Sequence, residues 1–505
     1  MKGDFTRFGF DAGKHYSRVL HQQGRVALDA DANEASAILL HHLRLLTRDL
    51  FGAAGGPPDS GFALSLDKSA SPAALLLGPG HYYVGGILCE NEHWADYAHQ
   101  PDRTPAPPVN NQGGDALLAW LAQPSADQAF WLYLDVWERH VTWIEDDSIR
   151  EPALGGPDTC TRAKVVWQAK ALPWDRGQWG DPHDNNDACG APMATLPSST
   201  GRMAAQLDPR AATTDPCIVS PGAAYRGAEN HLYRVEVHRG GSAGTSGGAS
   251  FKWSRENGSV ATRWLGSGSS GDAPTLTVAN PRGFTAGDWV ELSHDALDLA
   301  NEPGQLVRVA VVDGDQLVLD AASVPGGALM AWSEALVNPK LRRWDQRSSD
   351  IVALDEGAVP IVESPDSPLN WLDLEDGIQV AFEAGGSYRS GDYWLIPARV
   401  ATQGIDWPPP GGDDGAMQPP QGIVHAYAPL GVLVFDSADG LGIVSQCRHC
   451  LGLGQVECTL PTPPERGPRD IALERRPTRR LAASPAPASP SRAARPKPAA
   501  RKTSR

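Results

Sequence analysis

Apolar side chains near the start of the chain recur at helical spacing. Five of them follow one another at steps of four, four, three and four residues: Ala35, Leu39, Leu43, Leu46 and Leu50. This spacing places them on one face of a helix, which we expect over residues 32–50, with Gly52 at its end. Asp31, with Glu34 three residues later, predicts a capping box in which Asp takes the Ser/Thr role. We expect this apolar face to be buried, either by packing on its own domain or by docking into a larger assembly.

Beyond this helix the pattern changes to the alternation that is typical of β-strands. The segments with this pattern in the first half of the chain are a hairpin at residues 81–88 and strands at 130–138, 141–144, 164–168 and 232–238. Aromatic and β-branched residues make 130–138 the strongest of them. Residues 251–255 and 260–264 predict a further hairpin about Asn257 and Gly258. From about residue 173 to 224 the periodicity is weak, which indicates long loops.

The same criteria predict a small β module inserted in a larger β body. Alternation at residues 288–292 and a hairpin with arms at 305–312 and 316–319 indicate a compact, barrel-like unit. The predicted organisation is an N-terminal docking segment with the helix (1–60), a β-rich body (61–265 and 340–458), the inserted module (266–339) and a disordered basic tail rich in Pro, Ala and Arg (459–505).

Composition supports a mainly β, multi-sheet fold. The chain has 505 residues, of which 41% are hydrophobic and 21% charged, so it is neither wholly disordered nor a coiled-coil rod. Gly (53) and Pro (43) make up about a fifth of it, which favours short strands joined by many turns.

The net charge of −16 is unevenly distributed. The last 45 residues hold 12 Lys+Arg against 3 Asp+Glu, so the rest of the chain is more acidic than the total suggests. Nucleic acid is therefore not expected as a partner except through the tail. The first 20 residues contain no apolar run typical of a signal peptide, and no window is long enough to cross a membrane. We expect a cytoplasmic protein with no membrane partner and, for most of its seven cysteines, reduced thiols.

Three short patterns resemble catalytic motifs but lie in the wrong context. Residues 240–244 and 244–248 match a nucleophile elbow, and residues 266–271 match a dinucleotide fingerprint. Both mechanisms need a helix directly after the loop, and here the next predicted element is a strand. We therefore expect neither a catalytic serine nor a bound nucleotide.

The positions of the carboxylates and tryptophans in the sequence do not indicate a particular reaction. Asp135 and Glu138 stand three positions apart on a strand, so they point to opposite faces and cannot form an acid/base pair. The acidic cluster at residues 145–147 indicates a solvated loop. The 16 Trp residues fit core positions, although exposed ones could stack on sugars.

Cysteines near the end of the body form the best metal candidate. Cys447, Cys450 and Cys458, with His449 as a fourth ligand, could hold a structural zinc ion. Free thiols are the leading expectation for these cysteines, and the zinc site and a local disulfide are the alternatives. No other cofactor is expected.

Several longer motifs carry a family resemblance. They include MKGDFTR at residues 1–7 and further segments at 17–20, 22–26, 28–31, 78–84, 134–139, 153–159, 225–236, 251–260 and 391–399. In these the chain resembles an uncharacterised bacterial family, the family of unknown function 6519, over nearly its whole folded length. The members look like proteins encoded beside phage-tail-like contractile particles, and none has an assigned activity. The chain departs from the family pattern at Cys160, at the Cys447 and Cys450 pair, and in its basic tail.

This resemblance implies a non-enzymatic structural or adaptor component of such a particle, with the β body exposed. We expect docking through eight N-terminal residues: Phe5, Arg7, Arg18, Leu20, Arg25, Asp29, Asp31 and Glu34. Other particle proteins would be the partners, and the protein would be an oligomer within the assembly or be released with it. The alternatives are a glycan-binding fibre tip, a polysaccharide depolymerase with two carboxyl groups roughly 5–10 Å apart, and a particle cargo.

Overall fold

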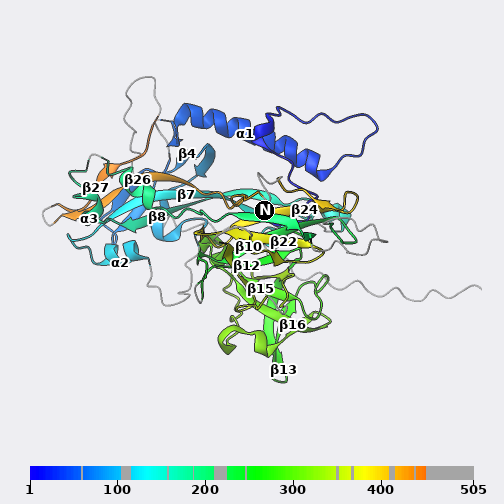
Figure 1. Cartoon of the computed structure of the whole chain (residues 1–505). Helices are drawn as coiled ribbons and strands as arrows, with labels where there is room; N and C mark the ends of the chain where they lie inside the picture. Colours follow the sequence, from blue (N-terminus) through cyan, green and yellow to red (C-terminus); the bar gives the residue numbers. More distant parts are fainter. Residues whose placement is uncertain are drawn as a thin grey trace, which may run out of the picture.

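A mainly β architecture with few helices is confirmed. The computed structural model describes residues 1–57, 61–103, 115–155, 158–185, 187–209, 224–244, 247–348, 352–364, 369–408, 416–436 and 439–450. In Figure 1 the long helix α1 lies along one side of a layered body of sheets, and a barrel projects from the opposite side. The predicted tail at 459–505 and Cys458 lie outside the described residues.

One large sheet joins strands from both ends of the chain. Its order is β8 (Arg162–Pro173), β7 (Ala129–Val141), β26 (Ala426–Asp436) and β27 (Gly440–Gln446), all antiparallel. On β7, Phe130, Leu132 and Leu134 enter one hydrophobic core, while Trp131 and Tyr133 enter another on the opposite face. The strand is therefore buried on both faces, which explains its continuous apolar sequence.

Two three-stranded sheets complete this half of the body. Their strands are β1 (Ala54–Gly55), β4 (Gly80–Val84) and β5 (Ile87–Asn91) in one, and β2 (Leu64–Asp67), β3 (Ala74–Leu77) and β6 (Ala95–Asp96) in the other. The predicted hairpin about Gly85 and Gly86 is confirmed, because β4 pairs with β5 across that turn. The short helix α2 (Ala116–Ala122) buries Leu117, Trp120 and Leu121 in the same core.

The other half of the body contains a second core. A five-stranded sheet runs β19 (Val359–Pro360), β12 (Ser250–Ser254), β10 (His231–Arg239), β24 (Tyr393–Arg399) and β25 (Gly404–Ile405). A four-stranded sheet contains β9 (Met203–Leu207), β20 (Glu363–Ser364), β21 (Leu372–Asp373) and β22 (Ile378–Glu383), and β11 (Gly241–Ser242) pairs with β23 (Ser387–Tyr388). Phe251, Phe382 and Trp394 meet at the centre of this core.

The inserted module is a closed barrel. Its strands follow the order β13 (Ala261–Ser270), β14 (Ala273–Val278), β17 (Gln316–Leu319), β16 (Gln305–Asp313), β15 (Trp289–Ser293) and β18 (Lys340–Trp344). The predicted hairpin at 305–312 and 316–319 is confirmed as β16 and β17. The barrel strands span 261–344, a slightly wider range than the predicted 266–339.

Four local predictions are wrong. Residues 141–144 form no separate strand, because β7 ends at Val141 and residues 143–145 form a turn. Residues 251–255 and 260–264 form no hairpin, because β12 pairs with β10 and β19 while β13 pairs with β14 and β18; the turn at Asn257 and Gly258 leads from the sheet into the barrel. The predicted loop region contains β9, the short helix α3 (Arg176–Trp179) and a 3-10 turn (Ala191–Thr195). The capping box is absent, since the N-cap of α1 is Leu28, which has no side-chain cap.

Candidate functional site

The helix α1 (Asp29–Phe51) carries an exposed apolar face. Four leucines from the predicted stripe stay in solvent, with exposed fractions of 61, 51, 56 and 60%: Leu39, Leu43, Leu46 and Leu50. We call these four residues the leucine stripe. Leu40 and Leu45 are also exposed, at 45 and 42%. The helix that the spacing predicted has formed, but its own domain does not cover its apolar face.

The opposite side of α1 is held on the body by a few contacts. Ala30 and Ile38 are the buried residues of the helix. The Arg44 guanidinium forms an ion pair with Glu138 of β7 at 2.8 Å. Gly86, with φ at 84°, lies against the Arg44 carbonyl so closely that a Cβ atom there would come within 2.4 Å of the oxygen. The helix is thus fixed to the body with the leucine stripe facing outward.

Residues 7–28, the N-terminal arm, form no α-helix or strand and contain only one 3-10 turn. Large apolar side chains are exposed along the arm: Phe8, Tyr16, Leu20, Val26 and Leu28. In Figure 1 the arm departs from the body and returns to the start of α1. The arm and α1 therefore share an unusual concentration of exposed apolar side chains.

The eight predicted docking residues differ in their exposure and contacts. Four of them lie exposed on the arm: Arg7, Arg18, Leu20 and Arg25. Asp29 accepts hydrogen bonds from the backbone N–H of Thr6, at 2.9 Å, and from its hydroxyl. Phe5 is half-buried and contacts the ring of His140. Asp31 and Glu34 are half-buried on α1. Asp29 and Phe5 thus make contacts within the chain.

The first residues of the chain enter a cavity of about 140 Å³ between the four-stranded sheet of β7, the five-stranded sheet of β10 and the barrel. We call it the junction cavity. The α-amino group of Met1 donates to the Tyr393 hydroxyl at 2.9 Å. Asn257 donates to the carbonyl oxygens of Met1 and Gly3 at 3.2 and 2.9 Å. The N-terminal residues are therefore part of the wall of this cavity.

A buried charged cluster lines one end of the junction cavity. Glu236 of β10 binds three cations: Arg234 Nε at 2.6 Å, Lys2 Nζ at 2.8 Å and Lys252 Nζ at 3.4 Å. Lys252 also forms an ion pair with Glu291 of β15. The Arg234 guanidinium stacks on Tyr393, 3.6 Å from the ring centroid. We call this group the Glu236 cluster.

A second cluster, centred on Lys340 of β18, lines the other end. The Lys340 ammonium lies 2.7 Å from Glu145, 2.5 Å from Asp298 and 3.7 Å from Asp295. These three carboxylates lie close enough together to hold a metal ion. Arg139 adds a second cation through its ion pairs with Asp295 and Asp298. Because each of the three carboxylates is paired with Lys340, and two of them also with Arg139, the geometry describes a salt-bridge network.

Burial and these ion pairs shift the titration of the cavity groups. Burial alone would raise the pKa of Glu291, but the charges of Lys252 and Lys2 lower it to about 2. Burial would likewise raise the pKa of Glu145, and Lys340 and Thr142 lower it to about 2. Burial, reinforced by neighbouring cations, lowers the pKa of His140 and of His238 to about 3. At neutral pH the carboxylates are charged and both imidazoles are neutral.

The lowered pKa values of the cavity carboxylates argue against the depolymerase alternative. A two-carboxylate glycosidase needs one carboxyl group whose pKa is raised, so that it can donate a proton. The cavity carboxylates Glu145, Glu291 and Asp298 all have lowered pKa values. They are therefore poor proton donors near neutral pH.

Asp135 and Glu138 do lie on separate networks, as their spacing predicted. The Asp135 carboxylate is bound by Lys170 and by His425 Nδ1, each at 2.6 Å, whereas Glu138 binds Arg44 of α1. Burial would raise the pKa of Asp135, but the hydrogen bond from His425 and the charge of Lys170 lower it. Asp135 is therefore a charged structural carboxylate.

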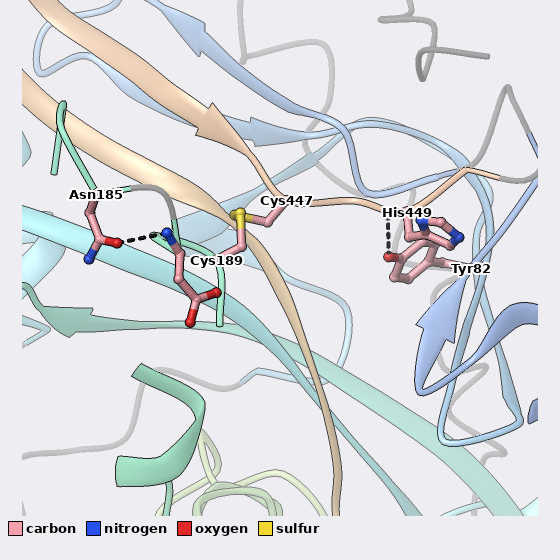
Figure 2. The surroundings of a disulfide bond; sticks show 6 residues. Tyr82, Asn185, Cys189, Cys447 and His449 are labelled. Atoms are coloured by element: carbon pink, nitrogen blue, oxygen red, sulfur yellow. Dashed lines mark hydrogen bonds between the residues drawn. A yellow bond between two sulfur atoms is a disulfide. The ribbon is translucent and has the colours of Figure 1, made fainter. Parts of the chain in front are cut away.

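The cysteines do not take the expected zinc arrangement. Cys447 forms a disulfide with Cys189, 258 positions earlier in the chain, and Cys450 is disulfide-bonded as well. Figure 2 shows Cys447 bonded to Cys189 in front of the sheet, with His449 turned towards Tyr82. The backbone N–H of His449 donates to the Tyr82 hydroxyl at 3.0 Å. A disulfide sulfur is not a thiolate ligand, so in this structure Cys447 is unavailable to zinc; Cys458 lies outside the described residues.

Free thiols occur at two other positions within the described part of the chain. Cys89 is buried and Cys160 is exposed. Burial raises the pKa of Cys89 to about 12, so this thiol stays protonated. The prediction of reduced thiols thus holds for these two residues and is wrong for Cys189, Cys447 and Cys450.

Comparison with known proteins places the chain in a family. A model described as a family of unknown function, DUF6519, matches residues 1–190 and 193–505. The chain belongs to this family. No curated protein and no solved structure matches it. Within the described residues, none of the helices of this family member is long and apolar enough to cross a membrane.

The junction cavity was missed by sequence reasoning. Its charged residues come from the N-terminus, from β7, β10, β12, β15 and β18, from the helix α4 (Asp295–Ala300) and from loops, so no short motif contains them. The available signal was charge inside predicted strands, as at Arg234, Glu236 and Lys252. Charged residues on a buried strand need partners, and those partners point to a junction between sheets.

Proposed function

We propose that the protein is a non-enzymatic structural or adaptor component of a larger assembly and that it docks through α1. The exposed leucine stripe carries this proposal. A surface helix normally turns its apolar face to a core and its polar face to water. On α1 this order is reversed, because the four stripe leucines are more than half exposed while Arg44 faces the body.

The distribution of exposed apolar residues supports the same conclusion. Most of the large hydrophobic side chains that are exposed in the described residues belong to the arm and α1, within the first 50 positions. The others are scattered singly over the body, as is ordinary for a protein surface. A contiguous apolar patch on one projecting element is typical of a protein interaction site.

A phage-tail-like contractile particle is the assembly that we propose, on the basis of the motifs at the start of the chain. In this proposal the protein is made in the cytoplasm and becomes part of a particle that can leave the cell. The disulfide between Cys189 and Cys447 fits a protein that spends part of its life in an oxidising environment. Other particle proteins are the proposed partners, and the β body faces outward.

The alternative functions have less support. A glycan-binding tip would use exposed tryptophans, but all 16 lie in described residues and none is among the exposed hydrophobic side chains. A depolymerase would need a carboxyl group that can donate a proton, and the pKa values of Glu145, Glu291 and Asp298 in the junction cavity are all lowered. A cargo role rests on the basic tail, which lies outside the described residues.

The test is co-purification with the native particle. We expect the double variant Leu43→Gln/Leu46→Gln to be lost from sedimented particles, because it places polar amides in the centre of the leucine stripe. The matched control is Leu88→Gln/Leu265→Gln, which changes two exposed leucines of β5 and β13 and should leave co-purification intact. Full retention of the stripe variant would refute docking through α1. Deleting residues 1–50 is a less specific test, because it also removes Met1 and Lys2 from the junction cavity.

A further inference from the structure

Positive charge exceeds negative charge in the Glu236 cluster. Four basic side chains line that end of the junction cavity: Lys2, Arg234, Lys252 and Arg342. The Met1 amine is not counted with them, because burial and the charges of Arg234 and Lys2 lower its pKa well below the usual value. Two carboxylates, Glu236 and Glu291, pair with these cations. Glu138 and Glu302 also line the cavity, and Glu138 is paired with Arg44. Among the ion pairs of the described residues none includes Arg342, whose guanidinium donates instead to the carbonyl of Gly258.

The other end of the cavity has its own ion pairs, in which Glu145, Asp295 and Asp298 bind Lys340 and Arg139. In the Glu236 cluster the cations outnumber the carboxylates that pair with them. An incomplete set of counter-charges is costly in a buried site, so this cluster gains from an added anion.

An unpartnered imidazole nitrogen supplies a second, independent observation. His238 of β10 lines the cavity and is only 7% exposed. Its Nδ1 lies 3.8 Å from Glu291, beyond hydrogen-bond distance, and has no hydrogen-bond partner among the residues that the structure describes. His140 Nε2, on the same cavity, is also buried without a partner. Buried polar atoms are normally satisfied, so unpaired ones on a cavity wall indicate that something polar occupies the space.

We propose that the junction cavity binds a small oxyanion of the phosphate or sulfate kind, between Lys2, Lys252 and Arg342. Tetrahedral oxyanions accept several charge-assisted hydrogen bonds at once, which suits ammonium and guanidinium donors that converge from different strands. A volume of about 140 Å³ admits an ion of this size together with water. The site is independent of the docking proposal, because none of the leucine-stripe residues lines the cavity.

The bound anion has a measurable effect on Lys2. Burial lowers the pKa of the Lys2 ammonium to about 8; Glu236 opposes this shift, and Lys252, Arg342 and Arg234 reinforce it. An anion beside these cations favours their charged forms and therefore raises the pKa of Lys2.

The experiment titrates the full chain with inorganic phosphate and, separately, with sulfate, at an ionic strength held constant with sodium chloride. Calorimetry is expected to show saturable binding of one oxyanion, and thermal melting a rise of the midpoint that chloride does not give. The variant Lys2→Met keeps an unbranched apolar side chain, removes the ammonium and should bind phosphate at least about tenfold more weakly. The control Arg308→Met removes an exposed cation of β16 and should bind as the unchanged protein does.

Two results would overturn the proposal. One is the absence of saturable binding to both oxyanions, and the other is unchanged affinity in Lys2→Met. Should that variant fail to fold, the unchanged protein decides the matter by NMR of the Lys2 side chain. A pKa of Lys2 that rises when phosphate is added supports the site, and a pKa that does not move refutes it.

Discussion

The helix α1 and the barrel both have regular apolar patterns, yet the leucines of the barrel are buried and those of the leucine stripe on α1 are exposed. In the barrel, Leu292, Leu317 and Leu341 are fully buried, because six strands close on themselves and enclose one face of each strand. On α1, Leu43 and Leu46 are more than half exposed, because the helix contacts the body along one edge only. An apolar pattern therefore specifies the secondary structure, while burial depends on whether the remainder of the chain supplies a second surface.

The largest contrast is expected from matched leucine truncations. Leu292→Ala should lower the free energy of unfolding by about 2–5 kcal/mol, because it leaves a cavity in the closed barrel. Leu43→Ala should change it by less than about 0.5 kcal/mol, since it removes only exposed surface. Urea unfolding measures both. Similar losses in the two variants would show that the leucine stripe is part of the folded core and would remove the basis for docking.

The disulfide separates the two regions in a second way. The loop closed between Cys189 and Cys447 contains the barrel but not α1. Cys189→Ser/Cys447→Ser should therefore lower the free energy of unfolding by about 2–4 kcal/mol, because it releases the constraint on the unfolded chain. Particle docking should be unaffected. The control Cys160→Ser, at an exposed free thiol, should change neither property. A non-reducing peptide map without the Cys189 to Cys447 link would contradict this prediction.

Acid should weaken the body through the junction cavity. Unfolded histidines take up protons near pH 6.5, whereas His140 and His238 do so only near pH 3 in the fold. Between these values the unfolded state binds more protons, so the free energy of unfolding should fall as the pH is lowered from 6.5 towards 3. The variant His238→Gln should reduce this slope, as measured by urea unfolding at several pH values. A slope that is the same with and without His238 would exclude its contribution.

Sequence patterns predicted much of the fold. The aromatic, β-branched run of β7, the glycine turn of β4 and β5 and the β16 and β17 hairpin were all specified locally, within a few residues. The hairpin about Asn257 failed because its two arms pair with distant strands, so β12 and β13 enter different sheets. Turn residues mark where the chain bends but not which strands it joins.

The two candidate sites also differ in how much of each could be predicted from local sequence patterns. The leucine stripe is a local pattern, so its spacing was visible in the sequence, although its exposure was not. The junction cavity depends on Lys2, Glu236 and Glu291, which are separated by more than 50 residues from one another, and on sheet register that no local pattern fixes. The Cys189 to Cys447 bond was hidden for the same reason, because the local spacing of Cys447 and Cys450 suggested only free thiols, a zinc site or a local disulfide.

The most direct test of docking is hydroxyl-radical footprinting of α1 in the isolated chain and in the native particle. The docking proposal predicts that Leu43 and Leu46 are oxidised readily in the isolated chain and strongly protected in the particle, while the exposed Leu265 on the barrel reacts equally in both. Equal oxidation of the leucine stripe in the two samples would show that the particle does not cover α1 and would contradict the proposal.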